Sequence, residues 1–165
     1  MKTLTLVRHA KSDWDTPASD HDRPLNRRGM KAAPKVGSAI AERGNIPDLV
    51  LSSTALRAVT TAQLIAKKIG IDNSIIHYDE QLYLPSIRDF EEVITRIDES
   101  MKTVNAMIVS HNPGSHEMSH YLTGDTSIDR FITCAVAVIE LDIKFWGEIG
   151  GKTGKLVDFF TPHDL

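Results

Sequence analysis

Short runs of branched aliphatic residues alternate along the chain with longer stretches in which apolar residues recur at helical spacing. The short runs predict strands at residues 4–7, 48–51, 74–77 and 106–109, followed by two more at 131–141 and 155–160. The longer stretches predict helices at residues 27–43, 55–69 and 87–97, and a further helix that opens at Asn112-Pro113. Strands that alternate with helices favour an α/β fold in which a mixed, mostly parallel sheet lies between two helical layers.

Length and composition are ordinary for one globular unit, and we expect a single domain over residues 1–165. The net charge of −3, without a basic tail, argues against a nucleic-acid partner, and no apolar run is long enough to cross a membrane. Arg8 and His9 interrupt the first apolar run too early for a secretory signal, and Cys134, the single cysteine, excludes an intrachain disulfide. These features predict a cytoplasmic protein with no membrane partner.

Three of the predicted strands end in residues that suit phosphate chemistry. The pairs are Arg8-His9, Ser52-Ser53 with Arg57 one helical turn further on, and Ser110-His111. Ligands of open α/β sheets bind beyond the carboxyl ends of the strands, so we expect these side chains to converge. Arginine forks bind phosphate oxygens in pairs, and an imidazole among them can attack phosphorus in line. The pattern therefore predicts a phosphoryl-binding site.

The segments that carry these residues resemble the motifs of a known family. The segments are Leu6-Val7-Arg8-His9-Ala10, residues 52–62 around Arg57, and Val109-Ser110-His111-Asn112-Pro113-Gly114. Together they resemble the histidine phosphatase superfamily, which has the phosphoglycerate-mutase-like fold. The short length, the Arg8-His9-Ala10-Lys11-Ser12 start and Arg23-Pro24-Leu25 followed by Gly29 resemble its SixA-like phosphohistidine phosphatases.

This resemblance implies a role for each matching residue. His9 would be the nucleophile that forms a transient phosphohistidine, while Arg8, Arg57 and His111 bind the phosphoryl group and Arg23 assists. It implies no metal and no cofactor. The acidic proton donor of the wider family follows the third strand, where Glu80 is the nearest candidate, with Asp79 beside it. Asp15 replaces a phosphate-binding Asn of many mutases, and we expect it to point away from the phosphate.

The lack of a clear proton donor at residues 81–84 favours one substrate class. An alkoxide leaving group needs a positioned acid, whereas a phosphohistidine leaves as a much less basic imidazole. We therefore expect a metal-independent phosphatase that acts on phosphohistidine in a protein. The alternatives are a broad phosphomonoesterase of small phosphorylated metabolites and a non-catalytic module that binds phosphorylated ligands.

Three other patterns have competing interpretations. His116-Glu117-Met118-Ser119-His120 matches the H-E-x-x-H zinc pattern, but no third ligand follows at a recognised spacing. Residues 13–16 resemble the aspartate motif of magnesium-dependent phosphatases, but no buried strand leads into them, and a polar loop is the better interpretation. The basic residues of the first predicted helix form either a solvated face or a docking surface for an acidic phosphoprotein. They are Arg27, Arg28, Lys31 and Lys35.

Overall fold

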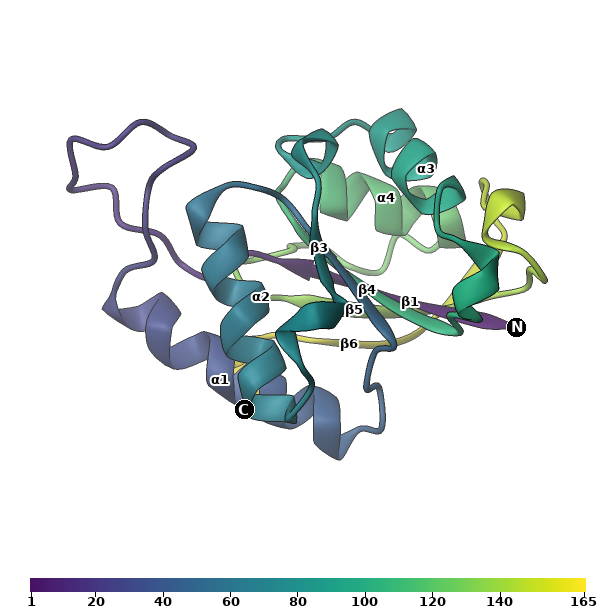
Figure 1. The fold of residues 1–165 in the computed structure, drawn as a ribbon, viewed down its shortest axis with the longest axis horizontal. Coiled ribbons are helices and arrows are strands. Elements are labelled where there is room, and N and C mark those ends of the chain that lie inside the picture. The colour runs from purple at the N-terminus through teal and green to yellow at the C-terminus, as the bar shows by residue number, and fades with distance from the viewer.

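The computed structural model describes all 165 residues as one mixed sheet between two pairs of helices (Figure 1). The strands are β1 (Lys2–Arg8), β2 (Leu49–Ser52), β3 (Ile76–Tyr78), β4 (Asn105–Ser110), β5 (Val136–Leu141) and β6 (Gly154–Phe160). The helices are α1 (Arg27–Glu42), α2 (Leu56–Ile69), α3 (Ile87–Thr95) and α4 (Gly114–Thr123). The predicted three-layer α/β fold is confirmed.

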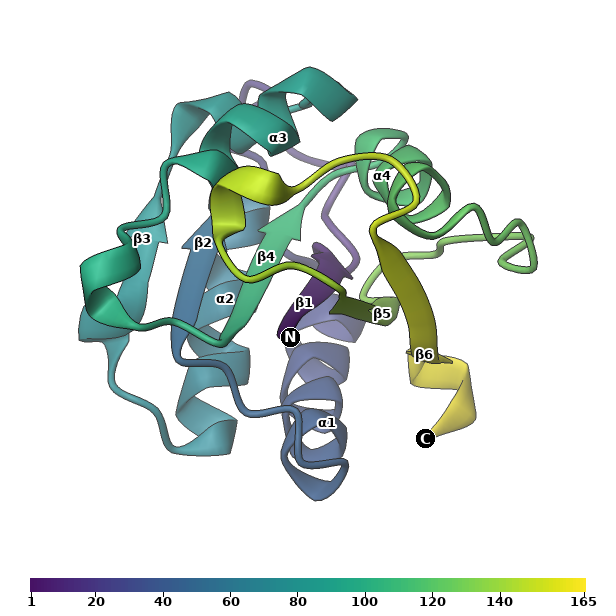
Figure 2. The same ribbon diagram turned by 90° about the vertical axis from the view of Figure 1, so that its right-hand side faces the viewer.

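The sheet has the strand order β3-β2-β4-β1-β5-β6, which can be followed in Figure 2. The first four strands in this order run parallel, whereas β5 and β6 are antiparallel to their neighbours. β1, β2 and β4 are therefore neighbours in the parallel part of the sheet. Their carboxyl ends lie at one edge, where the residues singled out in the sequence follow.

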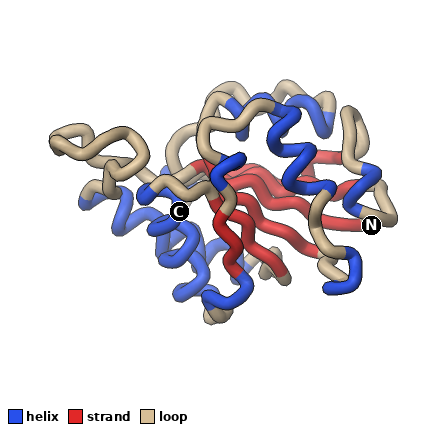
Figure 3. Tube along the Cα trace, turned by 45° about the horizontal axis from the view of Figure 1, so that its top comes forward, coloured by secondary structure: helices blue, strands red, loops and turns tan.

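Alternating side chains of the central strands enter two separate hydrophobic cores. Leu6 and Ile108 enter the core beneath α3 and α4, whereas Val7 and Val109 enter the core beneath α1 and α2. This alternation follows from the two-residue period of a strand, and both faces are covered because helices lie on both sides of the sheet (Figure 3). The two cores fix the register of β1 against β4, which pairs Arg8 with Ser110.

The start of α1 lies tightly against the segment that follows β1. Asn26 caps the helix, since its side chain accepts a hydrogen bond from the Gly29 N–H. A Cβ atom at Gly29 would lie 2.2 Å from the Lys11 carbonyl oxygen, so only glycine allows this approach. Between β1 and α1, a loop over residues 9–26 extends away from the sheet (Figure 1).

Two predicted strand starts were wrong, because local hydrogen bonds override the apolar pattern. The strand predicted at 74–77 begins only at Ile76, since Asp72 caps a 3-10 turn over Asn73–Ile75. The strand predicted at 131–141 begins at Val136. Before it, buried Cys134 takes a positive φ of 60° and donates its N–H to the carbonyl oxygens of Arg8 and His9. The helix expected to open at Asn112-Pro113 begins at Gly114.

None of the four helices is both long and apolar enough to cross a membrane.

Candidate active site

The carboxyl ends of β1, β2 and β4 are held in register by backbone hydrogen bonds. The His9 N–H donates to the Ser110 carbonyl oxygen at 2.9 Å, and the Ser53 N–H donates to the Val109 carbonyl oxygen at 3.0 Å. Beyond these ends lies a cleft of about 340 Å³. Its lining residues are Arg8, His9, Lys11, Ser12, Trp14, Asp20, Arg23, Arg57, Leu84, His111, Asn112 and Thr133. The structure therefore brings together Arg8, His9, Arg23, Arg57 and His111, as the sequence predicted.

His9 is held in one tautomer by the main chain. Its Nδ1 lies 2.7 Å from the carbonyl oxygen of Ala10. A carbonyl oxygen only accepts hydrogen bonds, so Nδ1 carries the proton and Nε2 keeps its lone pair. Burial lowers the pKa of His9 to about 3, and the charges of Arg57, Arg8 and Arg23 act in the same direction. At neutral pH this imidazole is an uncharged nucleophile surrounded by cations.

His111 lies beside His9, with ring centroids 5.1 Å apart. Its Nε2 is 2.7 Å from the hydroxyl oxygen of Ser53, which itself accepts the Ala55 N–H. When the Ser53 hydroxyl donates to Nε2, the proton of His111 is on Nδ1, a buried atom with no acceptor in the protein. Burial lowers the pKa of His111 to about 3, and the nearby His9 and Arg57 add to the effect. A neutral imidazole with a free N–H in this place is suited to bind a phosphoryl oxygen.

The three arginines of the cleft are only partly engaged by protein acceptors. Arg57 is 2% exposed and Arg23 is 6% exposed, yet the Nε atoms of both, and of Arg8, have no hydrogen-bond partner. Arg8 donates from Nη1 to the Phe131 carbonyl oxygen at 3.2 Å. Buried guanidinium donors without acceptors are unfavourable unless an anion completes their hydrogen bonds. The geometry thus fits a tetrahedral oxyanion such as phosphate.

Asp20 is a member of the site that the sequence analysis did not identify. Its carboxylate accepts hydrogen bonds from Arg23 and Arg57, each at 3.1 Å, and from the Tyr83 hydroxyl. The hydrogen bond from Tyr83, followed by those from Arg23 and Arg57, holds the pKa of Asp20 well below its usual range. The one carboxylate that lines the cleft is therefore ionised at neutral pH. Its signal in the sequence is its position three residues before Arg23.

Arg23 braces the loop that carries Asp20 from within, since its side-chain partners all belong to the same loop. This side chain donates to the Ser12 hydroxyl and stacks on the ring of Trp14, with the guanidinium carbon 3.6 Å from the ring centroid. Trp14 is 79% exposed, which places a large apolar surface at the rim of the cleft.

Glu80, the candidate proton donor, does not reach this cleft. It is exposed in a 3-10 turn over Glu80–Leu82 and is absent from the cleft lining. Its neighbour Asp79 caps the same turn and forms an ion pair with Arg96. Asp15 also stays outside the lining, as expected.

The H-E-x-x-H segment is engaged in local packing. The Nε2 of His116 is 2.9 Å from the Ile128 carbonyl oxygen and must donate to it, so this nitrogen has no free lone pair. The rings of His116 and His120 pack edge to face, with centroids 4.5 Å apart. No group of three or more His, Cys, Asp or Glu side chains is placed to hold a metal ion.

The comparisons with known proteins agree with the fold and indicate a family. Residues 4–83 match the sequence model of the histidine phosphatase superfamily, branch 1. An uncharacterized chloroplast protein of Arabidopsis thaliana is 31% identical over 160 residues, which are 93% of this chain and 72% of that protein. An uncharacterized protein of Mycobacterium tuberculosis is 31% identical over 168 residues, which cover 95% of this chain and all of that protein.

Solved structures extend the similarity to the whole chain. A protein from Agrobacterium tumefaciens assigned as the phosphohistidine phosphatase SixA is 28% identical, with a TM-score of 0.80 and 98% of both chains covered. The protein histidine phosphatase SixA in complex with tungstate has a TM-score of 0.83 at 19% identity, again over 98% of both chains, which supports the fold alone.

The α/β fold and the cationic cleft fit the phosphatase class that the family match and the similar structures support. The chain belongs to the histidine phosphatase superfamily, in its SixA-like branch.

Proposed function

We propose that this protein is a metal-independent phosphohistidine phosphatase that removes the phosphoryl group from a histidine of a phosphorylated protein. His9 is the nucleophile, Arg8, Arg57 and His111 bind the phosphoryl oxygens, and Arg23 supports them. The observation that carries the proposal is the hydrogen bond from His9 Nδ1 to the Ala10 carbonyl oxygen, because it leaves Nε2 as a lone-pair nitrogen inside the cationic cleft. The SixA assignment of the Agrobacterium tumefaciens relative supports the same reaction.

The first step is an in-line displacement at phosphorus. The Nε2 lone pair of His9 forms a bond to phosphorus while the bond from phosphorus to the substrate imidazole breaks, and its electron pair returns to the substrate nitrogen. Because the other nitrogen of the substrate ring is protonated, the ring leaves as neutral imidazole without a proton donor. His9 becomes a positively charged phosphohistidine, and the Ala10 carbonyl stabilises that charge through Nδ1–H.

The second step returns the enzyme to its starting state. Water forms a bond from oxygen to phosphorus, the bond to Nε2 breaks, and its electron pair returns to His9. The product leaves as dihydrogen phosphate, and His9 is again neutral with its proton on Nδ1. Both steps spread negative charge over three phosphoryl oxygens, and in this proposal Arg8, Arg57 and His111, which line the cleft, stabilise that charge.

The state of Asp20 supports phosphohistidine over phosphate esters. An ester needs an acid to protonate its alkoxide, and the one carboxylate of the cleft has its pKa lowered by Tyr83 and two arginines. An ionised carboxylate is a poor proton donor, whereas the leaving imidazole needs none.

The experiment compares phosphate release from a phosphohistidine protein and from a phosphoserine peptide, in EDTA, by wild type and by His9→Ala. We expect wild type to act on phosphohistidine alone and the variant to be inactive. Equal turnover of phosphoserine would replace the proposal with a broad phosphomonoesterase. Loss of wild-type activity in EDTA would contradict metal independence, and binding without release from either substrate would indicate a non-catalytic module.

A further inference from the structure

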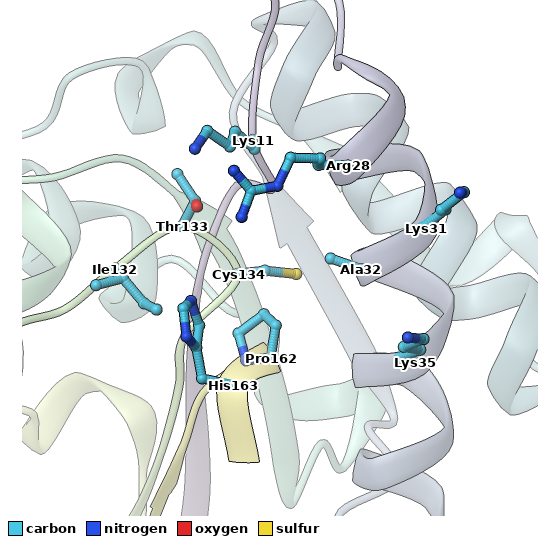
Figure 4. Close-up of a pocket in the computed structure, with 10 residues that line it drawn as sticks. All are labelled: Lys11, Arg28, Lys31, Ala32, Lys35, Ile132, Thr133, Cys134, Pro162 and His163. Atoms are coloured by element: carbon cyan, nitrogen blue, oxygen red, sulfur yellow. The ribbon is translucent and has the colours of Figure 1, made fainter. Parts of the chain in front are cut away.

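A second cleft adjoins the phosphate cleft and shares Lys11 and Thr133 with it. It has a volume of about 340 Å³ and lies between α1, the segment before β5 and the C-terminal end of the chain (Figure 4). Its lining residues are Lys11, Arg28, Lys31, Ala32, Lys35, Ile132, Thr133, Cys134, Pro162 and His163. A substrate group bound to His9 would therefore have this second cleft directly beside it.

The second cleft is strongly cationic and has no internal counter-charge. Lys11, Arg28, Lys31 and Lys35 are all exposed, and no Asp or Glu is among the lining residues. None of the four has a carboxylate oxygen within 4.0 Å, although other surface cations are paired, such as Arg43 with Asp158. The chain as a whole carries a net charge of −3, so this concentration of unpaired positive charge is local.

The cations are positioned by the packing of α1 against the segment after β1. The contact between Gly29 and the Lys11 carbonyl brings Arg28 and Lys11 together, and Figure 4 shows both cationic groups facing the space above Thr133. The ring of His163 lies on the opposite side, and the sulfur of Cys134 is at the base. The arrangement joins parts of the chain more than a hundred residues apart, and it points to an anionic ligand.

The length of the cationic row favours a macromolecular partner. Lys31 and Lys35 follow Arg28 on successive turns of α1, and seven residues at about 1.5 Å each give a row of about 10 Å. Lys11 extends this row to the border of the phosphate cleft. A row of this length can pair with several acidic side chains on a protein surface, whereas a small metabolite would offer it only one further anionic group.

We propose that the second cleft, with Arg28 and Lys35 as its test positions, binds acidic side chains next to the phosphorylated histidine of a protein substrate. This inference rests on the proposed function and adds the chemistry by which the partner is recognised. The contact acts in the ground state and on encounter, so it lowers KM and leaves the chemical step unchanged.

The test uses the full-length variant Arg28→Glu/Lys35→Glu and the control Lys67→Glu/Lys144→Glu, which makes the same change in charge outside the second cleft. Three substrates are compared at low salt: a phosphohistidine protein with flanking Asp and Glu, the same protein with these acids replaced by Asn and Gln, and free phosphohistidine. We expect the cleft variant to raise KM at least about tenfold for the acidic protein only, with kcat unchanged. The control is expected to match wild type on all three.

The possible outcomes distinguish failure of the inferred partner recognition from failure of the proposed phosphohistidine hydrolysis. Equal kcat/KM of the cleft variant and wild type on the acidic protein, or an equal loss on all three substrates, would overturn the inference while leaving phosphohistidine hydrolysis in place. A small bisphosphorylated compound is assayed as a fourth substrate, and an increase in its KM without an increase for the acidic protein would overturn the inference in favour of a metabolite subsite. Failure of wild type to hydrolyse any phosphohistidine would overturn the proposed function, and the inference with it.

Discussion

The cations that bind a phosphoryl group at this site also keep its nucleophile neutral. Arg57, Arg8 and Arg23 disfavour a proton on His9, in addition to the larger effect of burial. The Ala10 carbonyl then decides which nitrogen keeps the lone pair. One main-chain acceptor and a set of fixed charges thus prepare an imidazole for attack, without a neighbouring general base.

This arrangement predicts how His9 titrates. Its pKa is lowered from 6.5 to about 3, so the ring stays neutral as the pH falls from 8 to 5, and its proton stays on Nδ1. Unfolding frees the ring to take up a proton below about pH 6.5, so His9 lowers the free energy of unfolding as the pH falls from there towards 3. Nitrogen-15 NMR of the imidazoles would measure the titration midpoint of His9 and show which ring nitrogen carries the proton. A His9 midpoint near 6.5, or a proton on Nε2, would contradict this account.

Asp20 supplies a prediction that distinguishes an ion-pair partner from a proton donor. The Asp20→Asn variant keeps the size of the side chain but removes its charge and its acidity. We expect its kcat on phosphohistidine to fall by less than about tenfold, since general acids contribute about a hundredfold or more where they are needed. Steady-state kinetics beside wild type would measure this change. A loss of a hundredfold or more would identify Asp20 as the acid.

The strand pattern predicted the site residues at the strand ends, whereas the loop residue Arg23 came only from the family resemblance and Asp20 was missed. Arg8 ends β1, and His9 and His111 come directly after β1 and β4, so the apolar pattern of these strands locates all three. Arg57 is the second residue of α2. Asp20 belongs to a polar loop without periodicity, so its contact with Arg57, 37 residues away, is invisible in the pattern. Glu80 was the acid nearest in sequence to the expected proton donor, but the turn that contains it leaves its side chain in solvent.

Among the elements, α1 lines the second cleft and packs against Lys11, which borders both clefts, and Gly29 decides how closely the helix packs. A Gly29→Ala side chain would lie 2.2 Å from the Lys11 carbonyl oxygen, a main-chain atom that cannot move without displacing the end of β1 or the helix. We expect this change to lower the free energy of unfolding by about 1–3 kcal/mol. Urea unfolding would measure it.

The matched control for this change is Gly147→Ala. Nothing lies within 4 Å of a Cβ atom at Gly147, and its φ is not positive, so we expect a change of at most about 0.5 kcal/mol. An equal effect of the two substitutions would show that the contact at Lys11 is not the cause.

The strands buried on both faces were predicted well, whereas the starts of β3 and β5 were not. β4 has a continuous apolar run and β1 has one interrupted by the buried Thr5, because helices cover both sides of the sheet. In contrast, Asp72 turns the first half of the predicted third strand into a 3-10 turn, and the Cys134 N–H bonds to the ends of β1 instead of pairing in a strand. Apolar periodicity does not reveal where side-chain caps and turns take hydrogen bonds that strand pairing would otherwise use.

At the scale of the molecule, the convergence of three strand ends was predictable, but the strand order was not. Parallel strands share one carboxyl edge, and this rule alone brings Arg8-His9 towards Ser110-His111. The apolar periodicity does not indicate that β1 lies between β4 and β5, because the strand order depends on how the helices pack against the two faces of the sheet. The second cleft joins α1 to residues 132–134 and 162–163, so only the folded chain reveals it.

The central claim is that the Nε2 atom of His9 receives the phosphoryl group. In the most direct measurement, wild type is mixed with a phosphohistidine protein that carries a radiolabelled phosphoryl group, and the reaction is quenched in alkali within the first turnover. The transferred label is then mapped on peptides of the enzyme. We predict an acid-labile, alkali-stable label on His9, and none in His9→Ala. A label on another residue, or phosphate release by His9→Ala at the wild-type rate, would contradict this account.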